Sequence, residues 1–308
     1  MEAKLLGSWP SMREDNCEGG DRFTYVSVAE LSCAGTIRIV LESLIAHGDS
    51  SSIYLIVPED QVDEFKRLVG DLATIISELH VLPSWPLSRF RENLGEQGWR
   101  AGWYLQQFLK LSFDGYLKNE LQIDVDAYVV WDADTVMLKR PCYTKGEKKF
   151  FLKGRKIHLP YFDTINRIFG VKFSPNHSFI AQYMYVEMRF LMGMRSKIIE
   201  VTGEEDWIFG IIRSLPLVSD SEFSEYETYV SYLEMQIPES VCKAKGKWFL
   251  HGSDVISDPS KATLGYVEKR FSGYSLVAFE RHSPYFSRPV NILRRGIAKL
   301  FVFFRVQP

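Results

Sequence analysis

The chain has 308 residues, of which 46% are hydrophobic and 25% charged, as in an average soluble globular protein. This composition disfavours disordered, collagen-like and coiled-coil proteins, and the length suffices for one large domain or two ordinary ones. Thirty-seven Lys and Arg residues against 39 Asp and Glu residues leave a formal charge of −2. A surface built to hold nucleic acid is therefore not expected.

The four cysteines are far apart and form no C-x-x-C pair, so neither a zinc knuckle nor a dense disulfide framework is expected. The N-terminal stretch lacks the apolar core of a signal peptide, and no run of about 18 uncharged apolar residues suggests a membrane span. We therefore expect a protein that stays in the reducing cytoplasm.

From residue 23 onward, apolar strands alternate with amphipathic helices. The predicted strands lie at 23–29, 53–57, 79–82 and 127–131, and the predicted helices at 37–48, 62–69 and 98–120. Strands separated by such helices form right-handed β-α-β units and a mostly parallel sheet. The sequence therefore predicts an α/β fold in which helices flank a mostly parallel central sheet.

After residue 141 the pattern loosens. A Lys-rich segment is predicted as a hairpin over 145–156, and helices are predicted at 179–194, at 207–213 and from Ser224 onward.

The predicted organisation has an N-terminal segment, one catalytic domain made of a nucleotide-binding half and an acceptor half, and a C-terminal helical extension. In that order these are 1–22, 23–260 with halves 23–141 and 142–260, and 261–308.

Two carboxylates, Asp132 and Asp134, directly follow the fourth predicted strand. Ligands of parallel sheets bind beyond the carboxyl ends of the strands, so both lie at the expected ligand edge. Carboxylate oxygens suit Mg²⁺ or Mn²⁺, and such an ion would neutralise a substrate diphosphate. A lone D-x-D is common in solvated loops, and its place after a buried strand is what favours a metal site here.

The segments around these carboxylates resemble bacterial glycosyltransferases of the GT-A fold. The resemblance covers about 23–252 and lies in Gly98-Trp99, 106–111, 129–136, Arg140-Pro141, 177–180, 203–207 and 223–229. It implies a GT-A-like, Rossmann-related fold and transfer of a sugar in polysaccharide biosynthesis. The implied donor is a nucleotide sugar, UDP- or GDP-linked, and the implied acceptor is a hydroxyl of a glycan or of a lipid-linked molecule.

The same resemblance implies that Asp132 and Asp134 bind Mn²⁺ or Mg²⁺, that Asp132 also contacts the donor, and that His251 is a further metal ligand. Donor binding is also predicted for Gln107 and Lys110, with a solvated helix surface as the alternative. Acceptor-binding or supporting roles are predicted for Ser178, Asp206, Trp207, Tyr226 and Glu227.

The segment 223–229 (FSEYETY) contains two carboxylates with different expected roles. Ser224 and Glu227 have the spacing of a capping box, which explains Glu227 structurally. Glu225 has no such explanation and is predicted to be the general base that takes a proton from the acceptor. An exposed acidic residue favoured by the helix dipole is the alternative. Glu205 and Asp206 are the second candidates. A base favours an inverting single displacement, and retention stays open.

Beyond Glu280 the chain has six basic residues and no acidic one, mixed with apolar side chains. Such a tail predicts either a helix lying at an anionic membrane surface, which would place the enzyme on the inner face of the cell membrane, or a helix docked on the protein's own core.

Two other functions fit parts of the sequence. A strand followed by D-x-D-T-V also resembles the nucleophile motif of haloacid-dehalogenase-type phosphatases, with Asp132 attacking phosphorus and Asp134 as acid and base. That fold needs a later strand ending in an acidic pair, for which 201–206 is the candidate. A non-catalytic carbohydrate-binding protein is the remaining alternative, because a fold does not fix its function.

Overall fold

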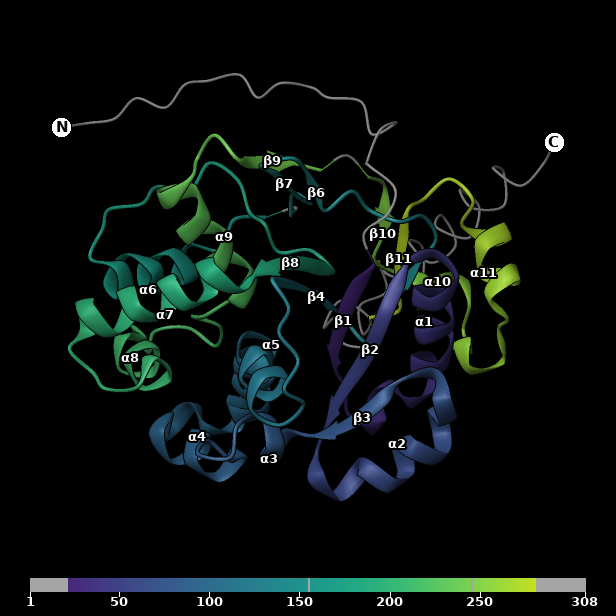
Figure 1. Ribbon diagram of the computed structural model, residues 1–308, viewed down its shortest axis with the longest axis horizontal. Coiled ribbons are helices and arrows are strands. Elements are labelled where there is room, and N and C mark those ends of the chain that lie inside the picture. Colours follow the sequence, from purple (N-terminus) through teal and green to yellow (C-terminus); the bar gives the residue numbers. More distant parts are fainter. Residues whose placement is uncertain (1–21, 155, 245, 281–308) are drawn as a thin grey trace, which may run out of the picture.

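The computed structural model describes residues 22–154, 156–244 and 246–280. Its centre is a five-stranded sheet with the strand order β3-β2-β1-β4-β8 (Figure 1). Four strands run parallel and the edge strand β8 is antiparallel: β1 (Phe23–Val28), β2 (Ser50–Val57), β3 (Thr74–Ser77), β4 (Ala127–Trp131) and β8 (Tyr183–Glu187). The predicted α/β fold with a mostly parallel central sheet is confirmed.

Helices cover both faces of this sheet (Figure 1). One face packs against α1 (Ala34–His47) and α2 (Val62–Val69), and α11 (Leu264–Arg270) packs against α1. The other packs against α5 (Ala101–Asn119), α6 (Leu159–Phe169), α7 (Met188–Thr202), α8 (Trp207–Ser214) and α9 (Glu225–Gln236). Alternate residues of β4 serve the two layers, since Tyr128 and Val130 belong to the α5 side and Val129 and Trp131 to the α1 side.

Two small sheets and three short helices complete the described fold. The sheets are β5 (Thr135–Met137) with β10 (Trp248–Phe249) and β11 (Leu276–Ala278), and β6 (Thr144–Lys145) with β7 (Lys148–Phe151) and β9 (Val241–Lys243). The helices are α3 (Glu78–Val81), α4 (Leu87–Asn93) and α10 (Gly252–Val255). The antiparallel pair β6 and β7 confirms the predicted Lys-rich hairpin, but the hairpin ends at Phe151 and not at residue 156.

The third predicted strand, 79–82, is wrong. The strand is β3, five residues earlier, where Ile75 and Ile76 pair with β2. The Ser77 hydroxyl accepts a hydrogen bond from the Leu79 N–H at 3.1 Å, so it caps a helical turn at the position where the strand was expected.

The predicted helix at 179–194 is wrong in its first half. Residues Tyr183–Glu187 form β8, which pairs along the whole of β4, and α7 begins only at Met188. Pairing with β4 satisfies its backbone groups and covers the edge of the sheet, which local sequence periodicity does not reveal. The helix α6 was not predicted.

The order of the strands reverses at β1. The chain builds outward from β1 to β2 and β3, and then returns to place β4 on the other side of β1. In open α/β sheets, ligands bind at such a switch point, beyond the carboxyl ends of the two central strands. The basic tail from residue 281, with its predicted membrane contact, and the segment up to residue 21 lie outside the described residues. No helix of the described part is both long and apolar enough to cross a membrane.

Candidate functional site

A cleft of about 420 Å³ lies at the switch point. Val28 at the end of β1, Cys33 before α1 and Asp132 after β4 line it, together with side chains of α5 and of the start of α9. The charged groups of its described lining are one ammonium and four carboxylates: Lys110, Asp132, Asp134, Glu225 and Glu280. The structure thus brings together carboxylates that are far apart in the sequence.

A tight turn after β4 presents Asp132 and Asp134 to this cleft. The Asp132 N–H donates to the Gln182 carbonyl at 3.0 Å, and the Thr135 N–H donates to the Asp132 carbonyl at 3.1 Å. The buried indole of Trp131 donates to the Thr135 carbonyl at 2.7 Å. These bonds fix the backbone between strand and turn, so both carboxylates are held in place by the sheet.

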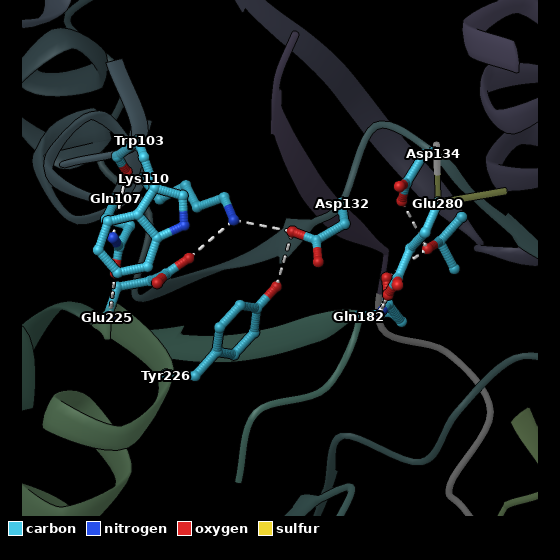
Figure 2. A network of polar contacts seen from close by, with 10 residues as sticks. Trp103, Gln107, Lys110, Asp132, Asp134, Gln182, Glu225, Tyr226 and Glu280 are labelled. Carbon is cyan, nitrogen blue, oxygen red and sulfur yellow. Dashed lines mark hydrogen bonds and ion pairs between the residues drawn. The ribbon is translucent and has the colours of Figure 1, made fainter. Parts of the chain in front are cut away.

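Lys110 connects the two sides of the cleft (Figure 2). Its Nζ lies 2.8 Å from Asp132 Oδ1 and 2.7 Å from Glu225 Oε1. The Tyr226 hydroxyl donates to the same Asp132 Oδ1 at 3.0 Å. Burial by itself lowers the pKa of Lys110, but the charges of Asp132 and Glu225 outweigh it and raise that pKa above its usual value. The side chain is therefore a permanent ammonium.

Gln107 fixes the start of α9. Its side-chain amide donates to the Trp103 carbonyl at 3.1 Å, and its Oε1 accepts the Glu225 N–H at 3.1 Å (Figure 2). Gln107 and Lys110 are 2% and 5% exposed, so the solvated-surface alternative is wrong for both. The face of α5 that carries Gln107 and Lys110 is not exposed to solvent, because α9 packs over it.

The Glu225 carboxylate is buried at the first turn of α9, so the alternative of an exposed acidic residue is wrong. Burial raises its pKa, and the neighbouring Lys110 ammonium opposes that rise. Burial and the nearby charge of Asp132 also raise the pKa of Asp134 to about 6. Asp132 and Asp134 are thus two carboxylates close to each other, and such a pair favours either a proton or a cation between them.

The predicted capping box is present in one half only. The Ser224 hydroxyl accepts the Glu227 N–H at 3.4 Å. The Glu227 carboxylate, however, accepts hydrogen bonds from the Ser178 hydroxyl and from the Phe179 N–H. It thereby ties α9 to the segment 178–182, of which Ile180, Ala181 and Gln182 line the cleft.

Five residues predicted for the site are not among those that line this cleft: Ser178, Asp206, Trp207, Glu227 and His251. The contacts of Ser178 and Glu227 are those just described. Asp206 caps α8, Trp207 packs against Phe108 and Arg195, and His251 pairs with Phe279 at the edge of the small β10-β11-β5 sheet. The alternative base at Asp206 therefore has no contact with the cleft in this arrangement.

We expect Asp206→Ala to lower the free energy of unfolding by about 1–2 kcal/mol, because the variant loses a helix cap and a buried partner. Asp206 Oδ1 accepts the Ile208 N–H at 2.7 Å, and Oδ2 accepts the Trp85 indole N–H at 2.5 Å. Denaturant unfolding measures the loss. The exposed neighbour Glu205, changed to Ala, is the control, and equal stability of the two variants would contradict the prediction.

The residues present fit a divalent cation of the magnesium type. Among the described residues, no three His, Cys, Asp or Glu side chains converge as a complete metal cage. Mg²⁺ commonly uses one or two protein carboxylates and takes its other ligands from water and substrate phosphates. Lys110 and Tyr226 both contact Oδ1 of Asp132 (Figure 2). The Thr135 hydroxyl contacts Oδ1 of Asp134. Each of these contacts uses only the Oδ1 atom of its carboxylate, so Asp132 and Asp134 are the residues that would hold such an ion.

Sequence reasoning missed several residues of the cleft, notably Gln182 and Glu280. The Thr135 hydroxyl lies 2.7 Å from Gln182 Oε1 and 3.2 Å from Asp134 Oδ1, and the Gln182 amide lies 3.4 Å from Glu280 Oε1. Gln182 precedes an antiparallel strand, so it lies at the same edge as the end of β4. Recognising β8 as a strand would have placed it there.

No curated protein matches the chain significantly. Among solved structures, the galactosyltransferase LgtC in complex with donor and acceptor sugar analogs is 12% identical, with a TM-score of 0.42 over 91% of this chain and 95% of that chain. Apo mouse xyloside xylosyltransferase 1 is 11% identical, with a TM-score of 0.41 over 87% and 100%. GlyE, a glycosyltransferase from Streptococcus pneumoniae TIGR4, is 13% identical, with a TM-score of 0.40 over 87% and 57%.

The sequence itself gives a firmer assignment. Residues 32–247, more than half of the chain and including every cleft carboxylate except Glu280, match the sequence model of one protein family. The chain belongs to DUF6492, a family of unknown function.

Proposed function

We propose that the protein is a metal-dependent glycosyltransferase that moves a sugar from a nucleotide-sugar donor to a hydroxyl of a glycan or lipid-linked acceptor. The observation that carries the proposal is the pair Asp132 and Asp134 at the switch point of the sheet, in one cleft with the buried carboxylate of Glu225. This arrangement offers a place for a cation, a place for a diphosphate and a base within the same cleft.

The charge of the cleft explains why a cation is needed. Asp132, Asp134 and Glu225 face it, and the ammonium of Lys110 is already shared between two of them. A diphosphate entering these surroundings would be repelled, because charges in a poorly solvated cleft interact strongly. A bound Mn²⁺ or Mg²⁺ supplies charge neutralisation at the diphosphate and its developing negative charge.

The chain's own groups would carry the remaining steps. Glu225 takes the proton from the attacking acceptor hydroxyl, and Gln107 holds the Glu225 backbone through the bond described above. Tyr226 and Lys110 fix the orientation of the Asp132 carboxylate. With a base on the acceptor, a single displacement inverts the configuration of the transferred sugar.

Residues 201–206 do not form the strand that the phosphatase alternative requires. Its second acidic strand was expected at 201–206, but α7 continues to Thr202 and Asp206 caps α8 away from the cleft. Asp132 is also held by two hydrogen-bond donors on one oxygen, which suits a fixed ligand.

A binding screen tests the proposal. We expect the parent protein to bind one of a panel of UDP- and GDP-sugars in the presence of Mn²⁺, and to bind it at least about tenfold more weakly with EDTA, as for an electrostatically bridged diphosphate. Asp134→Ala should bind that sugar equally weakly with and without Mn²⁺. Asp63→Ala, on the solvent-exposed surface of α2, is the control. Failure of every nucleotide sugar to bind the parent with Mn²⁺ would contradict the proposal and favour a non-catalytic protein.

A further inference from the structure

A lysine occupies the position from which a bound cation would be repelled. Lys110 lies in the middle of α5 and is paired with Asp132, one of the two proposed metal-binding carboxylates. Its side chain is 6% exposed, against 24% for Asp132. The ammonium is therefore the more buried partner of this ion pair, although Lys110 also lines the cleft.

The ammonium is held in place by its neighbours. Asp132 and Glu225 hold it from two sides, and the ring of Tyr226 lies 5.1 Å from Nζ. The backbone is fixed as well, because the Lys110 carbonyl accepts the hydroxyl of Tyr128 at 2.7 Å. An ammonium that left these partners would lose two ion pairs and leave the Glu225 carboxylate buried without its partner, so it stays when another cation arrives.

A divalent ion at Asp132 would share the carboxylate with this fixed positive charge. Like charges a few ångströms apart repel strongly where water is scarce, so the free ion is bound weakly. A diphosphate on the ion reverses the balance, because its negative charges attract the ion and the ammonium alike.

We propose that Lys110 is a positioning residue whose fixed charge keeps the affinity of this cleft for free divalent cations low, so that the ion binds together with the donor diphosphate. This inference rests on the proposed function. It assigns to Lys110 a role in the order of binding, which a purely structural ion pair would not have. Binding of ion and diphosphate must then be mutually favourable, because coupling between two ligands is reciprocal.

The test is a titration with Mn²⁺, read from the EPR signal of the free ion, without nucleotide and with saturating UDP or GDP. We expect Lys110→Met to bind free Mn²⁺ roughly tenfold or more tightly than the parent, because a repelling charge is removed. The gain in Mn²⁺ affinity caused by the nucleotide should shrink by a similar factor. Lys110→Gln, which is uncharged but still donates hydrogen bonds, should behave likewise and serves if the Met variant does not fold.

Lys149→Met is the matched control. Lys149 is also a buried lysine, paired with Glu187 at 2.7 Å, but it is not among the residues that line the cleft. Its loss should leave Mn²⁺ binding unchanged. Unchanged or weaker free Mn²⁺ binding by both Lys110 variants, with the parent binding Mn²⁺ and nucleotide together, would overturn the inference alone. A parent that binds no Mn²⁺ even with nucleotide would overturn the proposed function and the inference with it.

Discussion

Replacing Glu225 by Gln is expected to lower the transfer rate by roughly 1,000-fold, which is the usual contribution of a positioned general base. Affinity for the nucleotide sugar should change little, because the amide that replaces the carboxylate keeps the shape of the side chain and one acceptor for Lys110. Single-turnover transfer measures the rate, and equilibrium binding with Mn²⁺ measures the affinity.

The pH profile separates a base from a structural carboxylate. Burial raises the pKa of Glu225, so this base is protonated at a higher pH than an exposed Glu would be. The parent rate should therefore fall on the acid side. That acid limb should be missing from the residual rate of Glu225→Gln.

Glu187→Gln provides the control, since Glu187 is likewise paired with a buried lysine but is absent from the lining of the cleft. It should keep both the parent rate and the acid limb. Turnover of Glu225→Gln at the parent rate would remove Glu225 from the mechanism.

The place of Asp132 and Asp134 could be predicted because it depends on one strong local signal. The run AYVVW is apolar throughout, as a strand buried on both faces must be, and β4 ends where the run ends. The acidic turn follows immediately, so the rule that ligands bind beyond the carboxyl ends of parallel strands sufficed.

The partners of these carboxylates could not be predicted, because they depend on packing between distant segments. Periodicity assigned Lys110 to the outer face of its helix, and that face is buried only because α9 lies over it. Gln182 lies at the edge only because β8 pairs with β4 across more than fifty residues of chain. Such contacts are tertiary, and helical or strand periodicity carries no information about them.

Asp134→Asn is expected to make the metal-free protein more stable at neutral pH. Burial and the charge of Asp132 raise the pKa of Asp134 from 3.8 to about 6. The folded state therefore holds this proton more tightly than the unfolded state, and its stability falls as the pH rises from about 4 to about 6. A permanently neutral amide avoids this loss. The expected gain is up to about 3 kcal/mol above pH 7, vanishing below pH 4.

Unfolding in denaturant with EDTA, from pH 4 to pH 8, measures this difference. Asp114→Asn is a control that should change the free energy of unfolding in the opposite direction. Asp114 accepts two hydrogen bonds from Arg195, at 2.8 and 2.5 Å, and loss of its charge removes this ion pair and destabilises the fold. Adding Mn²⁺ together with saturating UDP or GDP should then stabilise the parent more than Asp134→Asn, since the ion relieves the repulsion that the amide has already removed. An Asp134→Asn variant less stable than the parent at pH 8 would mean that this carboxylate supports the fold and is not kept charged for binding a cation.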